Sequence, residues 1–316
     1  MIDLHMHSNR SDGTDSPVKL AKLAISAGLS AASLTDHDTI EGYAEFAAAL
    51  AGTAVEPICG CEISCKDPRT GTSVHVLCYF IPEGDSPFAT MLDAMKIKRA
   101  GRNLALLTKL QELGYDRLKA STIEAIAEKS LEKAGRPHFA QALIEAYSVA
   151  DPASPRDGLP RYFTEVGNVF SALLGENQAA YIPKATTTPA EASEAAHRSG
   201  ALTVLAHPII SYCPWDPNQP LDIEAQRALL EPALADAVAA GISGAEAYYS
   251  RHSPAQTAMM LELCQRFGLI ATGGSDYHGR NKPDLSLGRG VSAKRGTTSE
   301  LRVPDSALEA LYAARP

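Results

Sequence analysis

Apolar and polar residues follow two different periods along this chain, and the two kinds of segment alternate. Short apolar runs bounded by polar or glycine-containing stretches indicate buried strands, and longer stretches with apolar positions every three to four residues indicate helices. Strands are predicted at residues 1–5, 31–35, 57–65, 74–80, 201–206, 243–248 and 269–273. This alternation favours an α/β fold, close to a (β/α) barrel, over a β-sandwich.

Several predicted helices carry start and stop signals. Ser16 is a good N-cap before Pro17, and Gly28 ends the same helix. Asp38 and Glu41 resemble a capping box, which predicts a helix from there to about residue 51. Further helices are predicted at residues 189–199, 222–240, 254–267 and 305–313.

The third and fourth strands are joined by a short turn at residues 66–71, which leaves no room for a helical crossover. We therefore predict an antiparallel hairpin, in which the start of the fourth strand lies beside the end of the third. His75 is then expected near Glu62. Glu62 is a charged residue inside an apolar strand, where it needs a partner or a cation.

The strand pattern is missing between residues 87 and 185, where helical periodicity predicts an insertion. Its helices are expected at 91–113, 121–133, 137–149 and 164–175. The chain is therefore predicted to have a barrel made of residues 1–86 and 186–290, and a helical, substrate-binding subdomain at 87–185. The remaining residues, 291–316, are predicted to form a C-terminal tail without an assigned function.

The composition is that of an ordinary globular protein, with 45% hydrophobic and 21% charged residues. No apolar run is long enough for a membrane span, and no secretory leader is evident, so a cytoplasmic location is expected. The six cysteines lack paired zinc-site spacing and are read as buried thiols.

Charge is distributed unevenly along the chain. The net charge of -8 argues against binding of duplex DNA. Between Lys96 and Arg161, however, the sequence contains twelve basic and eight acidic residues, which gives a local charge of +4. A basic segment beside an acidic, metal-holding site suits a small phosphorylated molecule or a phosphorylated strand end, and no obligate protein partner is evident.

Histidines and acids gather at the predicted strand ends. Barrels of this type place their chemistry at the carboxyl face, so these side chains are expected to converge there. Six histidines and three acids without thiolates suit manganese, iron or zinc. The candidate metal ligands are His5, His7, Asp12, His37, Glu62, His75, His207, Asp276 and His278.

The same residues resemble the motifs of the PHP (polymerase and histidinol phosphatase) domain. The matching motifs are His5-x-His7, Asp12, Asp36-His37-Asp38, Glu62, His75, Ala206-His207-Pro208 and Gly274-Ser275-Asp276-Tyr277-His278. The resemblance implies a distorted seven-stranded (β/α) barrel of the amidohydrolase-like type with a helical insertion. Gly135-Arg136-Pro137-His138 in the insertion looks more narrowly like small bacterial phosphatases of 3′,5′-bisphosphorylated nucleotides.

The resemblance also implies how the metals are shared. His5, His7, Glu62 and Asp276 would hold one ion, and Glu62 would bridge to a second held by His75 and His207. Asp12, His37 and His278 would either hold a third ion or face the phosphate as catalytic and substrate-binding groups. Two or three divalent ions are thus expected, manganese first, with iron or zinc as alternatives.

The expected reaction is hydrolysis of the 3′-phosphate of a nucleoside 3′,5′-bisphosphate by a water activated between two metals. His252 is a candidate proton donor to the leaving oxygen. The uncleaved phosphate needs fixed cations, and arginine grips phosphate with two donors. The candidate substrate contacts in the insertion are Arg99, Arg102, Asn103, Arg136 and His138.

Three alternatives are weighed against this expected reaction. The chain could be a 5′-to-3′ exoribonuclease acting on the 5′ end of a short RNA. It could also be another phosphatase of the family, such as a histidinol phosphatase. A non-catalytic, metal-stabilised module would predict missing ligands, and none is missing.

Overall fold

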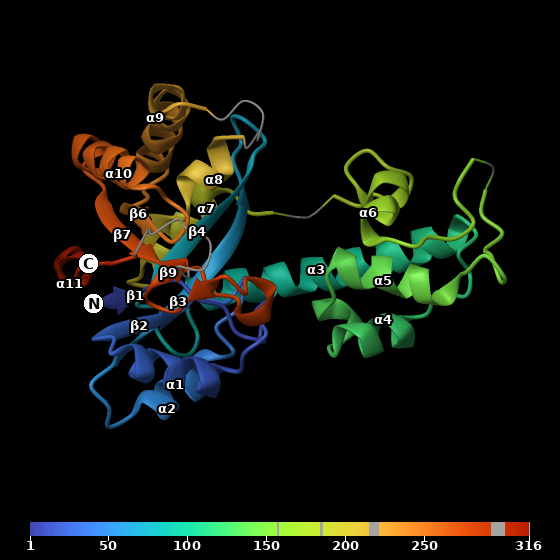
Figure 1. The fold of residues 1–316 in the computed structure, drawn as a ribbon, viewed down its shortest axis with the longest axis horizontal. Coiled ribbons are helices and arrows are strands. Elements are labelled where there is room, and N and C mark those ends of the chain that lie inside the picture. Colours follow the sequence, from blue (N-terminus) through green and yellow to red (C-terminus); the bar gives the residue numbers. More distant parts are fainter. Residues whose placement is uncertain (157, 184–185, 215–220, 292–300, 316) are drawn as a thin grey trace. The chain divides into compact units, whose positions relative to one another are not determined.

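The computed structural model of the chain describes residues 1–156, 158–183, 186–214, 221–291 and 301–315. They fall into two compact units (Figure 1). Unit 1 comprises Met1–Leu92 and Thr186–Pro316, and unit 2 comprises Asp93–Ala185. Within the described parts of the chain, no helix is both long and apolar enough to cross a lipid bilayer.

Unit 1 is built on a seven-stranded sheet in the order β1 to β7. Neighbouring strands are parallel except at β4, which is antiparallel to both β3 and β5. Leu4 N donates to Gly273 O at 3.3 Å, so the chain after β1 meets β7 and nearly closes the barrel. The strands are β1 (Ile2–Asp3), β2 (Ala31–Leu34), β3 (Glu56–Lys66), β4 (Ser73–Tyr79), β5 (Leu202–Leu205), β6 (Gly244–Tyr249) and β7 (Ile270–Gly274). The predicted distorted seven-stranded barrel is confirmed.

The predicted hairpin is confirmed as well. In the antiparallel register of β3 and β4, Ser64 pairs with His75 and Glu62 pairs with Leu77. His75 therefore lies near the start of β4, beside the late residues of β3. Because β4 runs opposite to its neighbours, its first residues share a rim with the last residues of the parallel strands.

Helices surround the barrel, with α1 and α2 covering the early strands and α10 lying against β6 and β7 (Figure 1). Ser16 accepts a hydrogen bond from Lys19 N at 3.3 Å, and Gly28 ends α1 with a φ of 69°, as predicted. The helices of unit 1 are α1 (Pro17–Ala27), α2 (Tyr43–Leu50), α7 (Pro189–His197), α8 (Pro208–Tyr212), α9 (Ile223–Ala239), α10 (Pro254–Phe267) and α11 (Asp305–Ala313). A 3₁₀ turn at Gly279–Asn281 and a small ribbon, β8 (Leu285–Ser286) with β9 (Gly290–Val291), follow β7.

The predicted capping box at Asp38 is wrong. Helix α2 begins at Tyr43, after Gly42. Asp38 has a φ of 54°, and its carboxylate accepts hydrogen bonds from the backbone N–H of Ser64 at 2.8 Å and from the Ser64 hydroxyl. The side chain thus holds a neighbouring strand and leaves the helix start without a side-chain cap.

Helix α11 belongs to the core of unit 1. Its residues Leu308 and Leu311 are buried in one apolar cluster with Ile2, Leu77 and Val204 from the barrel strands. Burying side chains of this size contributes roughly 1.5–3 kcal/mol each. The predicted C-terminal helix, to which the sequence assigned no function, therefore helps to fill the barrel. Residues 292–300 and 316 lie outside the described chain.

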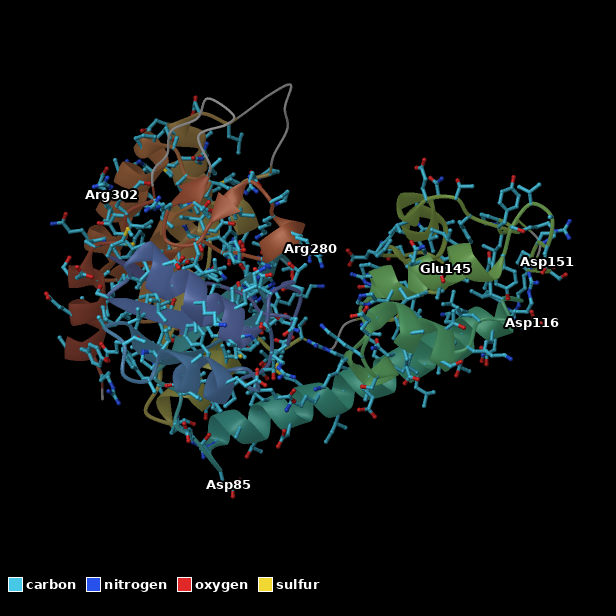
Figure 2. The ribbon with its side chains drawn as sticks, turned by 60° about the horizontal axis from the view of Figure 1, so that its bottom comes forward. Asp85, Asp116, Glu145, Asp151, Arg280 and Arg302 are labelled. Carbon is cyan, nitrogen blue, oxygen red and sulfur yellow. The ribbon has the colours of Figure 1, made fainter. Side chains whose placement is uncertain are left out.

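In the described residues of unit 2, helices and irregular connections are the structure that is present. Its core is formed by α3, α4 and α5 around the buried side chains of Leu110, Tyr115, Phe139 and Leu143. At one end of unit 2 Arg117 pairs with Asp151, and Figure 2 labels Asp116 and Asp151 at this end. The helices are α3 (Pro87–Glu112, which begins in unit 1), α4 (Ala120–Ala127), α5 (Arg136–Ala146) and α6 (Val166–Val169), with a 3₁₀ turn at Leu131–Lys133 and a π turn at Phe170–Leu174.

Candidate metal centre

The nine predicted ligands meet at the carboxyl rim of the barrel. Their nitrogen and oxygen atoms form four overlapping groups, and within each group the atoms lie within 4.8 Å of one another. The groups are His7, Asp12, His37 and His278; His5, His7 and Asp276; His5, Glu62 and His207; and His37, Glu62 and His75. The convergence expected from the strand ends is therefore present in unit 1.

Strand alternation explains how the first two ligands reach the cluster. His5 and His7 are two residues apart, so their side chains point to the same side of an extended chain. Met6 between them is fully buried on the opposite side, in the cluster that also contains Leu20 and Phe46. Extended backbone at this position thus directs two imidazoles inward and one thioether outward.

Glu62 occupies the middle of the cluster, and its two carboxylate oxygens face different sets of histidines. Oε2 lies 3.1–3.2 Å from nitrogen atoms of three of them. Oε1 lies 3.0–3.1 Å from nitrogen atoms of two others. The first set is His5, His7 and His37, and the second set is His75 and His207. A carboxylate with separate imidazole sets on its two oxygens has the arrangement of a bridge between two ions.

The cluster fits divalent ions on its own geometry. Ligand bonds of about 2.0–2.2 Å place neighbouring ligand atoms roughly 3 Å apart, which matches the spacings around Glu62. The Nδ1 atoms of His7, His37 and His75 are buried without a hydrogen-bond partner, so they remain available as ligands. Nitrogen and oxygen ligands without thiolates suit manganese, iron or zinc.

Charge compensation in the cluster changes how its histidines titrate. Burial opposes a charge on His7, but hydrogen bonds to Asp276 and Glu62 outweigh it and raise the pKa of His7 to about 9. His5 behaves in the same way, since burial is outweighed by Glu246, Glu62 and Asp276, and its pKa lies well above the usual value. Protons on these two rings thus balance part of the buried negative charge, a role that bound cations would take over.

His37 titrates in the opposite direction. Burial lowers the pKa of His37 to about 3, and the nearby Glu62 only partly offsets that effect. The ring is therefore neutral at physiological pH. A neutral imidazole is the form that binds metals.

The third group lies at the more accessible edge of the cluster. Asp12 is 54% exposed along its side chain, and its Oδ1 lies 3.3 Å from His278 Nε2. Its Oδ2 lies 3.6 Å from His37 Nε2. His278 Nδ1 donates to the carbonyl of Asp276 at 2.8 Å, which leaves Nε2 facing the cluster. Asp12 is thus the most exposed of the nine candidate ligands, followed by His75, whose side chain is 27% exposed.

Two side chains outside the predicted ligand set hold Asp276 in place. The Tyr249 hydroxyl donates to Asp276 Oδ2 at 2.7 Å, and Lys282 pairs with the same oxygen. The other oxygen, Oδ1, is left facing His5 and His7 at 3.6 and 3.5 Å. Lys282 sits on the turn after β7, where no periodic pattern marks a position as functional.

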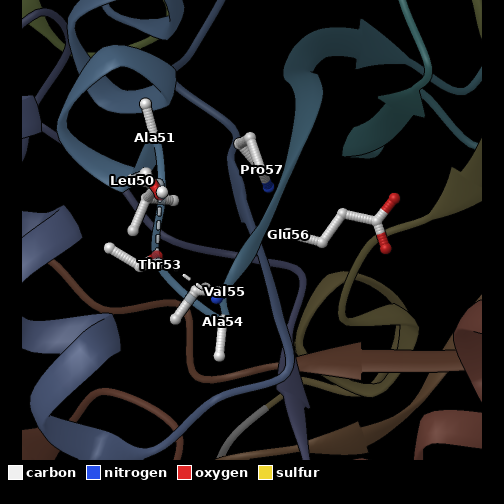
Figure 3. A pocket seen from close by; sticks show the side chains of 8 residues that line it. Leu50, Ala51, Thr53, Ala54, Val55, Glu56 and Pro57 are labelled. Carbon is white, nitrogen blue, oxygen red and sulfur yellow. Dashed lines mark hydrogen bonds between the residues drawn. The ribbon is translucent and has the colours of Figure 1, made fainter.

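The ligands open into a cavity of about 420 Å³. Besides ligand residues, it is lined by Ile210, Tyr249, Asn281 and Lys282. A second hollow of about 310 Å³ lies at the turn from α2 into β3 and is lined by residues 50–57 (Figure 3). Its one acidic residue, Glu56, points away from the others and bonds to Tyr312, so this hollow offers no ligand set.

His252 is not among the residues that line the cavity. It is 3% exposed, its Nδ1 donates to the carbonyl of Ala247 at 3.0 Å, and its ring lies 5.2 Å from that of Tyr249. Burial lowers the pKa of His252. The expectation that this ring protonates a leaving group therefore needs correction, since the structure places it in the barrel wall.

The predicted substrate contacts of the insertion all belong to unit 2. Burial lowers the pKa of Arg102, and the nearby charges of Arg136 and Arg99 lower it further. Arg136 donates to the carbonyl of Leu174 at 3.1 Å, and its guanidinium lies 6.0 Å from the Tyr181 ring. A group of like charges of this kind would be stabilised by an anion.

Two other predicted substrate contacts, Asn103 and His138, make hydrogen bonds to backbone groups of unit 2. Asn103 is fully buried, and its amide donates to the carbonyls of Leu131 and Ala134 at 2.8 Å each. His138 Nδ1 accepts a hydrogen bond from Gly135 N at 2.9 Å at the start of α5. Asn103 is thus placed as a residue that holds the unit together, which corrects its expected role as a substrate contact.

A nearly closed (β/α) barrel that gathers six imidazoles and several carboxylates at its carboxyl rim has the architecture of a multinuclear metal-dependent hydrolase. The PHP domain model matches residues 3–199 of this sequence. The chain belongs to the PHP domain family.

Curated relatives of similar length carry three different names. The chain is 29% identical over 283 residues to phosphoribosyl 1,2-cyclic phosphate 1,2-diphosphodiesterase of Eggerthella lenta, covering 88% of this chain and 94% of that protein. It is 27% identical to 3′,5′-nucleoside bisphosphate phosphatase of Chromobacterium violaceum, covering 91% and 90% of the two chains. It is 26% identical to a 5′-3′ exoribonuclease of Haemophilus influenzae, covering 87% and 89%.

Solved structures show the same fold. An amidohydrolase from Chromobacterium violaceum with bound sulfate superposes with a TM-score of 0.69 at 24% identity, covering 99% of this chain and 96% of that one. A protein from Bifidobacterium adolescentis, described as a metal-dependent phosphoesterase, gives the same TM-score and identity over 99% and 95%. Family, fold and ligand set together place the chain among the metal-dependent phosphoesterases of the PHP family.

Proposed function

We propose that the chain hydrolyses the 3′-phosphate of nucleoside 3′,5′-bisphosphates and releases a nucleoside 5′-monophosphate and phosphate. The observation that carries the hydrolytic part is the position of Glu62, whose two oxygens face separate sets of histidines. The relative from Chromobacterium violaceum that bears this activity in its name supports the choice of substrate.

The residues that would hold the ions follow from the groups described above. Glu62 would bridge a first site, completed by His5, His7 and Asp276, and a second site, completed by His75 and His207. Asp12, His37 and His278 would hold a third ion or contact the phosphate directly. Bound divalent cations, with manganese as our first choice, would lower the pKa of a water molecule and polarise the phosphoryl oxygens.

The chain's own side chains have separate tasks in this scheme. Asp12, at the accessible edge, and His278 beside it would orient the phosphate and donate a proton to the leaving oxygen. Lys282 lies on the cavity wall and is 27% exposed, so its ammonium group can also meet a phosphate oxygen. Tyr249 and Lys282 keep Asp276 from rotating, because both hold the oxygen that faces away from the histidines.

Recognition of the second phosphate is proposed for the arginines of unit 2. Arg99, Arg102 and Arg136 supply concentrated positive charge, and a guanidinium can give a phosphate two parallel hydrogen bonds. Tyr181 near Arg136 offers an aromatic ring that suits a base. These contacts distinguish a bisphosphate from a simple phosphate monoester.

The test compares four substrates with manganese-loaded enzyme and with enzyme treated with a chelator. The substrates are adenosine 3′,5′-bisphosphate, a 5′-phosphorylated oligoribonucleotide, phosphoribosyl 1,2-cyclic phosphate and histidinol phosphate. Phosphate release that is fastest from the bisphosphate supports the proposal. Preferred release of mononucleotides from the oligoribonucleotide would instead identify an exoribonuclease, which the relative from Haemophilus influenzae makes the second candidate.

Arg136→Ala tests the substrate assignment separately from the metal centre. It is expected to raise the KM for the bisphosphate about tenfold or more while the metal content stays unchanged, since a charge-assisted hydrogen bond contributes roughly 1.5–3 kcal/mol. Lys119→Ala removes an exposed cation of the same unit and serves as the matched control. Equal kinetics for wild type and Arg136→Ala would remove the support for a bisphosphate substrate.

A further inference from the structure

A fourth carboxylate, Glu246, lies beside the ligand cluster in the wall of the barrel. Its side chain has no exposed surface. It belongs to β6, whose pairing with β7 shifts register between Glu246 and Tyr248, a bulge of the kind that re-aims side chains next to functional sites. A buried carboxylate is costly unless both of its oxygens have partners.

Both oxygens of Glu246 are used, and each holds one predicted metal ligand. Oε1 lies 3.0 Å from His5 Nδ1. Oε2 accepts a hydrogen bond from the backbone N–H of His207 at 2.8 Å. His5 follows β1 and His207 follows β5, so one side chain connects ligands that are more than two hundred residues apart in the sequence.

The contact with His5 determines which ring nitrogen carries the proton. An ionised carboxylate only accepts hydrogen bonds, so His5 Nδ1 must be the donor. When a metal displaces the second ring proton, Nε2 is the atom that offers it a lone pair. This atom lies 3.2 Å from Glu62 Oε2 and 3.1 Å from His7 Nε2, which is where the cluster needs a ligand.

The contact with His207 supports an unusual backbone. His207 has φ 28° and ψ 58°, a left-handed conformation that side-chain-bearing residues adopt at some cost. The hydrogen bond to Glu246 stabilises this turn at the end of β5. In this conformation His207 Nε2 lies 3.1 Å from Glu62 Oε1.

We propose that Glu246 is a positioning residue that fixes the His5 proton on Nδ1 and the turn of His207, so that both Nε2 atoms face the Glu62 bridge. The role rests on the proposed function, because it takes His5 and His207 as metal ligands. A group that merely filled space could be replaced by glutamine. A positioning carboxylate could not, since an amide offers one acceptor and one donor where two acceptors are needed.

The test measures metal affinity by chelator competition on refolded, metal-free protein, starting with zinc. Glu246→Gln is expected to weaken binding about 10- to 100-fold. Thr272→Val is the matched control, because Thr272 is the register partner of Glu246 on β7 and its buried hydroxyl has no hydrogen-bond partner. This control is expected to bind zinc like the wild type.

A second measurement needs no variant. Nitrogen-15 spectra of the zinc-loaded wild type are expected to show His5 with a hydrogen-bonded proton on Nδ1 and without one on Nε2. Zinc affinity of Glu246→Gln equal to that of the wild type, or a proton on His5 Nε2, overturns the role of Glu246 and leaves the proposed function standing. A wild type that binds no divalent metal overturns the proposed function and this role together.

Discussion

Metal affinity is expected to increase steeply with pH, because bound cations must displace protons from buried histidines. His7 is fully buried between Asp276 and Glu62, and its pKa is raised to about 9. At pH 7 this ring is therefore protonated in the metal-free protein. A metal ligand must be the neutral imidazole, so each binding event at this site releases a proton.

The size of the effect follows from the difference between the pKa and the working pH. The pKa of His7 is about 9, which is about two units above a solution pH of 7. Removing the proton from His7 at pH 7 therefore costs about 2.7 kcal/mol. Affinity at pH 7 should then be roughly 100-fold lower than above pH 9 from this residue alone. His5 has a pKa raised in the same direction and steepens the dependence further.

Two measurements check this expectation. Chelator competition between pH 6 and pH 9 should show log affinity increasing by one to two units per pH unit, as expected for the release of one or two protons. Calorimetry in two buffers of different protonation enthalpy counts the released protons directly. His7→Gln should lower the slope by about one unit. An affinity that is flat over this range, or binding at pH 7 without proton release, would refute the charge balance described for the cluster.

Three further outcomes are expected. His7→Ala should abolish phosphate release and lower the metal content measured by elemental analysis, because it removes a ligand next to Glu62. In the metal-free protein, the raised pKa of His7 should stabilise the fold by up to about 3 kcal/mol below about pH 6.5. This contribution is lost as the pH rises through about 9, and urea unfolding measured at several pH values can follow the loss. Phe139→Ala should destabilise unit 2 by roughly 3–5 kcal/mol in the same assay while the metal content of unit 1 is retained.

Local sequence signals predicted those elements whose limits depend on local chemistry. Helix α10 runs from Pro254 to Phe267 as predicted, with Ser253 as its cap, because capping and periodicity act within a few residues. The hairpin of β3 and β4 followed from the length of its turn alone. The start of α2 was misplaced because Asp38 bonds to Ser64, a residue 26 positions away that no local pattern reveals.

The convergence of the candidate ligands was predictable for a different reason. In a barrel the carboxyl ends of the strands share one rim, so histidines and acids at strand ends must approach one another. Glu246 carried the same signal as Glu62, a charge inside an apolar strand, although it was not among the predicted site residues. Lys282 depends on the 3₁₀ turn at Gly279–Asn281, which only the folded chain brings back to Asp276.

Three of the six non-glycine residues with positive φ in the described parts of the chain lie where strands lead into the candidate metal centre. Asp38, His207 and Asp276 have φ values of 54°, 28° and 52°, and they follow β2, β5 and β7. Left-handed backbone costs such residues roughly 1–2 kcal/mol each. At each position a hydrogen bond from a neighbouring element opposes the cost: Asp38 accepts from Ser64 N, His207 donates to Glu246, and Asp276 N donates to His5 O at 2.8 Å. Contacts within the protein thus hold the candidate ligands in place, and we expect metal binding to require little rearrangement beyond the displacement of protons.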